Sequence, residues 1–247
     1  PLLRSPDVLS ERDDVHARVL IETYIPGNEF AIEGAMTDGA FRPFVIFDKP
    51  DPLVGPFFEE TIYVTPSRAS DVVQEAIVEA VATAARAIGL RHGPVHAECR
   101  VNTRGVYLLE VAPRPIGGLC ARAVRFHEAA GAVVPLEEVL LRHSLGQDIS
   151  RWAPSTRAAG VMMIPIPRRG VYRGVKGLEA AAACPGVDDI RITAKADELV
   201  LPLPEGRSYL GFIFASGDDP GAVEQSLRDA HASLTFEIDR DIALLRR

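Results

Sequence analysis

Closely spaced cysteines, long apolar runs and blocks of like charge are all missing from this 247-residue sequence. Its three cysteines, Cys99, Cys120 and Cys184, lie too far apart for the usual zinc spacings or a disulfide framework, which favours a reducing cytoplasm. No stretch approaches ~18 uninterrupted apolar residues, and the N-terminus lacks a signal-peptide pattern. The net charge of -7 comes without a basic run. We therefore expect a cytoplasmic protein that neither crosses a membrane nor binds nucleic acid.

An initial methionine is also lacking, and the first 17 residues are polar before an apolar stretch begins at Arg18. We expect from this that the chain is a piece of a longer protein. What is present is a hydrophobic content of 47%, which is ample for the core of one large domain or two modest ones. The composition therefore predicts a soluble globular chain.

The pattern of apolar and turn residues predicts an α+β fold in two parts. Residues 18–152 should form an antiparallel sheet with helices, because alternating runs are separated by turn signals such as Pro26-Gly27 and Asp38-Gly39. Apolar residues recur at helical spacing over residues 70–88, and Gly89 follows as a stop. The predicted strands lie within residues 18–49, 62–64 and 94–112, and the predicted helices at residues 70–88, 118–131 and 134–148.

A linker is expected at residues 152–156, where the pattern relaxes. Beyond it, residues 156–247 should form a small α+β domain, because strand-like and helix-like segments interleave there. The strand-like segments are residues 159–167, 189–194, 198–203, 209–216 and 235–238, and the helical ones are residues 177–184 and 219–234. Residues 1–17 should precede both parts as a separate segment.

The stretch PVHAECRVNTRGVYLLEVAPRPIGG, residues 94–118, reads as a hairpin with a glutamate in the middle of each strand. With a three-residue loop ending at Gly105, Asn102 would pair with Val106, and Glu98 would lie directly opposite Glu110. A four-residue loop would instead send the two glutamates to opposite faces of the sheet. The chemistry of this hairpin therefore depends on its turn.

Two facing carboxylates need a shared proton or a cation between them, and a hard divalent cation such as Mg²⁺ takes oxygen ligands alongside phosphates. By alternation, His96 shares a face with Glu98, and Arg114 shares a face with Glu110. Gly117-Gly118 would offer backbone N–H groups to an anion at the start of the next helix. The alternative is that both glutamates are ordinary solvent-facing strand residues.

Three motifs in this region occur in the order of a known family. HAE, then EVAPRPIGG, and before them IETYIPGNEF resemble the C-terminal half of an ATP-grasp domain, the fold of carboxylate-amine and carboxylate-thiol ligases. The resemblance covers about residues 18 to 145. It is closest to the L-amino acid ligases that form dipeptides, and residues 156–247 resemble their small C-terminal domain. This family has an α+β fold and uses ATP and Mg²⁺.

The resemblance implies roles for several residues. Glu22 matches the hinge that binds adenine, and Glu29 matches the carboxylate that holds the ribose hydroxyls. Lys49 could contact phosphate. Either Glu59 or Glu60 falls where such ligases place a polar residue near the acceptor, and the sequence does not choose between them.

The resemblance also implies roles for the hairpin. Glu98 and Glu110 match the carboxylates that bind Mg²⁺, and Arg114 with the Gly117-Gly118 backbone matches the region that receives the substrate carboxylate and its acyl phosphate. Ala112 departs from the family, which often has asparagine there, so metal binding would rest on the two glutamates, phosphates and water. Of the six histidines, His96 alone shares a face with the glutamates by alternation, where it would either contact the substrate or support the hairpin.

The function implied is ATP-dependent activation of a carboxylate, such as that of an amino acid, for attack by an amine. The family's first half would precede residue 1, so we expect that this chain alone does not turn over and that it partners the missing half. Small-molecule substrates and a homodimer are compatible with this reading. The alternatives are a bicarbonate-activating carboxylase-type enzyme and a non-catalytic nucleotide-binding or oligomerisation module.

Overall fold

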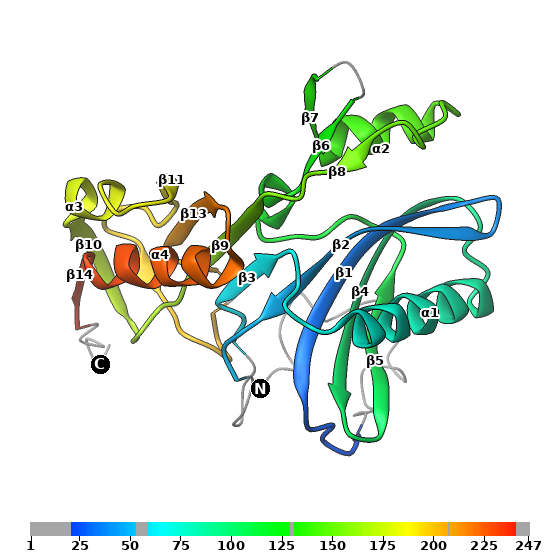
Figure 1. Ribbon diagram of the computed structural model, residues 1–247. Coiled ribbons are helices and arrows are strands. Elements are labelled where there is room, and N and C mark those ends of the chain that lie inside the picture. Colours follow the sequence, from blue (N-terminus) through cyan, green and yellow to red (C-terminus); the bar gives the residue numbers. More distant parts are fainter. Residues whose placement is uncertain (1–20, 53–58, 129–130, 207, 241–247) are drawn as a thin grey trace.

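The computed structural model describes residues 21–52, 59–128, 131–206 and 208–240 (Figure 1). The predicted segment at residues 1–17, the start of the first predicted strand at residues 18–20, and residues 241–247 of the predicted C-terminal domain lie outside this part. Among the described helices, none has both the length and the apolar character needed to cross a membrane.

Along the chain, helices separate short groups of strands. The strands are β1 (Asn28–Thr37), β2 (Ala40–Lys49), β3 (Ile62–Thr65), β4 (Gly93–Asn102), β5 (Gly105–Ala112), β6 (Arg125–His127), β7 (Val133–Pro135), β8 (Ala153–Pro154), β9 (Ala158–Ile164), β10 (Gly170–Lys176), β11 (Val187–Ile192), β12 (Leu199–Val200), β13 (Gly211–Gly217) and β14 (Thr235–Asp239). The helices are α1 (Asp71–Ala87), the 3-10 helix η2 (Cys120–Ala123), α2 (Leu136–Ser144), α3 (Leu178–Ala182) and α4 (Pro220–Ala232).

An eight-stranded sheet runs through the molecule in the order β11-β13-β9-β3-β2-β1-β4-β5 (Figure 1). Every neighbouring pair in it is antiparallel, which confirms the predicted α+β class. Strand β3 pairs with β9, so the sheet continues across the linker expected at residues 152–156. The domain limits that we predicted remain a prediction.

The β1–β2 hairpin turns at Asp38-Gly39, as predicted. Both residues have positive φ, 51° and 88°, the backbone that two-residue hairpin turns favour. The strand predicted before this hairpin is wrong in its described part, because residues 21–27 form no ladder. Instead, Asn102 donates a hydrogen bond of 2.7 Å to the carbonyl of Pro26. A Cβ on Gly27, where φ is 137°, would lie 2.3 Å from the carbonyl oxygen of Val101, so only glycine allows this close approach.

Helix α1 contacts β2, β4 and β5 on one face of the sheet (Figure 1). Its predicted apolar face is confirmed, because Ile77 and Val81 are buried in one cluster with Phe30 of β1. Successive residues of a strand point to opposite faces, so Glu29 and Glu33 of β1 point away from α1. That opposite face carries the polar residues described below.

The C-terminal part extends the same sheet. The predicted succession of strands and helices over residues 159–238 is confirmed, with α4 packed on β9 and β13. Strand β10, which the pattern did not predict, forms a second sheet in the order β12-β10-β14. Buried residues of β3 and of the C-terminal strands share one apolar cluster, so the two parts pack as neighbours.

The helix predicted at residues 118–131 is wrong in its described part. It is the four-residue 3-10 helix η2 followed by strand β6, which pairs with β7 and β8. The physical reason is a period of two: Val124 and Phe126 are buried, whereas Arg125 and His127 are exposed. Strand β8 lies within the expected linker, and α2 confirms the helix predicted after β7.

The β4–β5 hairpin combines an error with a correct prediction. The three-residue turn is wrong, because Asn102 pairs with Gly105 and leaves two residues in the turn. Further along β5 the register shifts by one residue, at Leu109. Because of this bulge, Glu98 lies opposite Glu110, as predicted.

Candidate functional site

A polar cluster arises from the pairing of β1 with β4. Their register sets Glu29 opposite Arg100 and Glu33 opposite His96. Residues directly opposite in an antiparallel pair project to the same face, so these side chains lie with that of Glu98 on the face away from α1. Glu29, Glu33, His96 and Arg100 are all buried.

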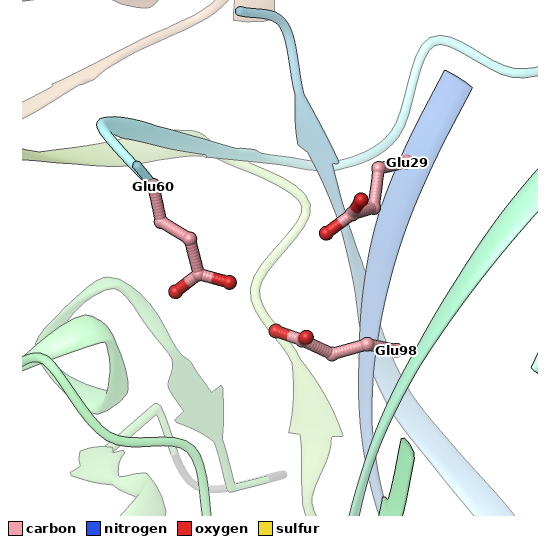
Figure 2. A group of neighbouring side chains, drawn as sticks. All are labelled: Glu29, Glu60 and Glu98. Atoms are coloured by element: carbon pink, nitrogen blue, oxygen red, sulfur yellow. The ribbon is translucent and has the colours of Figure 1, made fainter. Parts of the chain in front are cut away.

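Lys49, the last residue of β2, places its ammonium among three carboxylates. Its Nζ lies 2.6 Å from Oε1 of Glu29, 2.6 Å from Oε1 of Glu60 and 2.9 Å from Oε1 of Glu98. Figure 2 shows the three glutamates pointing toward one another from separate segments. The Lys49 side chain is 3% exposed. Charge-assisted hydrogen bonds in such a buried place are strong, so Lys49 fixes the three carboxylates relative to one another.

Oppositely charged neighbours in this cluster favour the ionised form of one another. Burial alone would lower the pKa of Lys49, but the neighbouring Glu60, Glu98 and Glu29 outweigh burial and raise that pKa above its ordinary value. Burial alone would raise the pKa of Glu98, but His96 and Lys49 outweigh it and lower that pKa to about 2. Lys49 and Glu98 are therefore both ionised at neutral pH.

His96 bridges two carboxylates. Its Nδ1 is hydrogen-bonded to Oε1 of Glu33, and its Nε2 lies 3.6 Å from Oε1 of Glu98. The backbone N–H of Ile116 donates to the second oxygen of Glu33 at 3.1 Å. Burial alone would lower the pKa of His96, but its contacts with Glu33 and Glu98 raise that pKa from 6.5 to about 9. The His96 ring is thus a buried cation that supports Glu98.

Arg100 joins the cluster to the segment that precedes β1. Its Nε donates to Oε2 of Glu29 at 2.8 Å, and its Nη1 donates to the carbonyl of Ile25 at 2.7 Å. The guanidinium carbon lies 4.9 Å from the ring centre of Tyr24. Both oxygens of Glu29 therefore accept from protein cations, and residues 21–27 are held beside the cluster.

A hollow of about 480 Å³ opens where this segment meets β4 and β5. Its lining includes Glu22, Glu29, Glu60 and Glu98, together with the apolar side chain of Leu108. Pockets for small molecules typically have volumes of about 300 to 1,000 Å³ and combine apolar walls with a few polar groups. The hollow therefore has the size and lining of a small-molecule site, and Glu22 is an exposed part of its wall.

Glu110 and Arg114 form a separate pair beside this cluster. Nη2 of Arg114 lies 2.9 Å from Oε1 of Glu110, and the two side chains are 50% and 45% exposed. Glu110 lies opposite Glu98 in the ladder, but it is outside the group of carboxylates around Lys49. The side chain of Arg114 is thus half exposed to incoming molecules.

Gly117 and Gly118 lie in an exposed loop before η2. The helix expected after them has four residues, too few for a helix dipole to act on an anion, so that part of the prediction is wrong. Gly118 has a φ of 59°, and a Cβ there would lie 2.8 Å from Sδ of Met163. The positive φ therefore favours glycine at position 118, whereas the flexible side chain of Met163 could move aside for a Cβ.

The structure brings Glu22, Glu29, Lys49, His96 and Glu98 to one place. Glu110 and Arg114 form a separate pair, and Gly117 and Gly118 follow Ile116, whose backbone N–H contacts Glu33. Of the two alternatives, Glu60 joins the cluster through Lys49. Glu33 and Arg100 were not predicted as site residues. The alternation of Glu29, Ala31 and Glu33 could have placed Glu33 on the same face.

The cluster fits a hard divalent cation by its chemistry. Ligand oxygens of Glu29, Glu60 and Glu98 all lie within 4.8 Å of one another, and Mg²⁺ prefers oxygen ligands. The ammonium of Lys49 lies among these same oxygens. A divalent cation there would compete with Lys49, and one held between Glu98 and Glu110 would compete with Arg114, which is paired with Glu110.

Two protein families match this chain in succession. Residues 8–123 match the ATP-grasp domain, and residues 162–239 match the L-amino acid ligase C-terminal domain 2. The chain carries an ATP-grasp domain followed by an L-amino acid ligase C-terminal domain. This result confirms the resemblance seen in the motifs around Glu29, Glu98 and Glu110.

Two curated relatives are similar to parts of this chain. Carnosine synthase 1 of Gallus gallus is 32% identical over 167 residues, which is 65% of this chain and 18% of that protein. Alanine–anticapsin ligase of Bacillus amyloliquefaciens is 35% identical over 118 residues, which is 47% of this chain and 23% of that protein. The chain therefore spans less than a quarter of the length of each.

A solved structure supports the same family. The L-amino acid ligase from Bacillus licheniformis superposes with a TM-score of 0.75 at 27% identity. The match covers 88% of this chain and 53% of that ligase. Both parts of this chain are therefore included in a match that spans about half of that ligase.

Proposed function

We propose that the protein is an ATP-dependent ligase that activates the carboxylate of an amino acid as an acyl phosphate and joins it to an amine. The succession of an ATP-grasp domain and an L-amino acid ligase C-terminal domain supports this reaction. One similar protein is, by its name, a ligase of alanine and anticapsin, and another is a synthase of carnosine. These names favour amino acids as the substrate class.

The observation that carries the proposal is the ionised Glu98, held between Lys49 and His96 at the edge of the hollow. Adenine and ribose would enter the hollow beside Glu22 and Glu29, as the family resemblance implies. Phosphates are then directed toward Glu98, where Mg²⁺, held by Glu98 and Glu110, would neutralise their negative charge. Transfer of a phosphoryl group depends mainly on such positioning and charge neutralisation.

The chain's own residues hold this arrangement. Lys49 orients Glu98, and buried His96 keeps it ionised. Because both oxygens of Glu29 already accept from Lys49 and Arg100, a ribose hydroxyl would use the remaining lone pairs of that carboxylate.

Arg114 is the proposed contact of the substrate carboxylate. Its planar guanidinium can bind a carboxylate or an acyl phosphate through two parallel hydrogen bonds, and it is half exposed for this purpose. The backbone of Gly117-Gly118 lies next to it in sequence and is also exposed. We place the amine acceptor near Glu60, the acidic residue of the cluster that lies outside the β1–β4 ladder.

The experiment is an assay of ADP release with the full-length protein, because the relatives are longer than this chain. Pairs of L-amino acids and, separately, bicarbonate are supplied with ATP and Mg²⁺. ADP release that requires an amino acid pair, with the dipeptide detected by mass spectrometry, is the expected result. Activity with bicarbonate alone would instead indicate a carboxylase-type enzyme and refute the proposal.

A further inference from the structure

A second hollow, of about 370 Å³, lies beside η2 and the strands β9 and β13. It is rich in arginine, because Arg122 of η2, Arg125 of β6 and Arg157 before β9 all line it. Asp188 is the acidic residue in the lining. The hollow shares no residue with the acidic cluster around Lys49, so it is a separate feature of the fold.

Arg122 is fixed in place at this hollow. Its guanidinium carbon lies 3.9 Å from the ring centre of Phe214, and its Nη2 lies 2.9 Å from Oδ2 of Asp189. Its Nη1 is buried and has no hydrogen-bond partner among the described residues. Because Nη1 is closed to solvent, a ligand in the hollow would contact the rest of the Arg122 side chain, which is 30% exposed.

The other two arginines are free to bind. Arg125 and Arg157 are exposed, and neither side chain makes an ion pair or a hydrogen bond with another residue in the part of the chain that the structure describes. Other arginines of the surface, such as Arg173 and Arg228, are each paired with carboxylates. Two guanidinium groups without partners among the described residues therefore concentrate positive charge at this hollow.

The acidic residue of the lining does not cancel this charge. The carboxylate of Asp188 accepts a hydrogen bond of 3.1 Å from Oγ of Ser216, so it is engaged at the rim. Arg122 is already paired with Asp189, so Arg125 and Arg157 against Asp188 leave the lining with one net positive charge. A concave, electropositive surface raises the local concentration of anions.

We propose that this hollow binds a small oxyanion, inorganic phosphate or a carboxylate, through Arg122, Arg125 and Arg157. A guanidinium presents its N–H donors in a planar fork that matches the oxygens of both kinds of anion. The anion would supply partners for Arg125 and Arg157, beside the partly exposed side chain of Arg122. The site lies apart from Arg114, so the ligand need not be the carboxylate that is activated.

The test is calorimetric titration of the full-length protein with inorganic phosphate and, in a second arm, with succinate. The nucleotide site is first filled with ADP, so that binding there does not contribute. We expect saturable binding, weakened about tenfold or more by Arg125→Gln or Arg157→Gln, since each removes charged hydrogen bonds. The anion that binds more tightly identifies the source of the ligand.

The control is Lys195→Gln, which removes the same charge from an exposed residue outside the hollow and should leave binding unchanged. Arg125 and Arg157 have no side-chain partners among the described residues, so both variants should keep the wild-type melting temperature without anion. The anion should raise the melting temperature of the wild type and not that of the double variant. Absence of saturable binding by either anion, or equal binding by the double variant, would overturn the proposal.

Discussion

Glu98 and Glu110 lie directly opposite each other on β4 and β5, yet each carboxylate has its own cation. Nζ of Lys49 lies 2.9 Å from Glu98, and Nη2 of Arg114 lies 2.9 Å from Glu110. Like charges in directly opposite positions destabilise a sheet, so these two cations are what make the pair tolerable. A divalent cation shared by the glutamates would take over that role when nucleotide binds.

Replacing either glutamate should remove the capacity of the pair to share a divalent cation. We expect Glu98→Gln and Glu110→Gln each to lower ADP release by the full-length protein by about 100-fold or more, because charge stabilisation of the transition state is lost. The Mg²⁺ concentration that gives half-maximal rate should rise in both variants. Glu75→Gln, the same change on an exposed position of α1, is the matched control. Full activity of Glu110→Gln would contradict the assignment of Glu110 as a metal ligand.

Lys49→Met should destabilise the fold. The substitution leaves Glu29, Glu60 and Glu98 without their shared cation in a largely buried place. Removing one partner of a buried ion pair typically costs about 3 to 5 kcal/mol, so we expect the free energy of unfolding in urea to fall by about 3 kcal/mol or more. Lys195→Met on an exposed loop should change it by less than about 0.5 kcal/mol. A loss below about 1 kcal/mol at Lys49 would show that the cluster is not held by its ammonium.

The β4–β5 hairpin shows which features could be predicted from the sequence. The turn was predicted wrongly, but Glu98 and Glu110 still pair, because the bulge at Leu109 restores the register that the wrong turn assumed. Two adjacent leucines, Leu108 and Leu109, interrupt the alternation of β5 and were the local sign of the bulge. Helix α1 and the Asp38-Gly39 turn were predicted correctly because their signals are local.

The rest of the site depends on contacts that are distant in sequence. His96 and Glu33 are separated by 63 positions, and only the pairing of β1 with β4 brings them together. Lys49 reaches Glu98 across 49 positions. Periodicity gives the face of a strand but not its neighbour in the sheet, so the cage of carboxylates around Lys49 could not be predicted from the sequence.

Arg114→Lys should impair catalysis and leave stability unchanged. Lysine keeps the charge but loses the planar fork that can hold two oxygens at once. We expect kcat/KM for the amino acid that is activated to fall by about tenfold or more, in proportion to the loss of one charged hydrogen bond. Because Arg114 is half exposed, its pair with Glu110 contributes little to folding, and the melting temperature should stay the same. Unchanged kcat/KM would remove Arg114 from the proposed substrate site.

His143 of α2 should make stability depend on pH. It is 2% exposed, its Nε2 lies 2.9 Å from Oγ1 of Thr37, and its ring stacks on His92 with centroids 4.0 Å apart. Burial, and then the neighbouring His92, lower the pKa of His143 below its ordinary value of 6.5. Below pH 6.5 the unfolded chain therefore takes up a proton that the folded protein excludes.

The contribution of His143 to the free energy of unfolding should consequently be fully present above pH 6.5. It should be lost as the pH drops through that value, by up to about 1.4 kcal/mol per pH unit for this one group. His143→Gln removes the titrating group and keeps a side chain that can hydrogen-bond to Thr37. Urea unfolding at a series of pH values, from about 7.5 to about 5.5, measures both proteins. The difference in stability between wild type and variant should shrink toward low pH, since only the wild type loses stability through this residue. A constant difference over the whole series would mean that His143 is protonated as readily in the folded protein as in the unfolded chain.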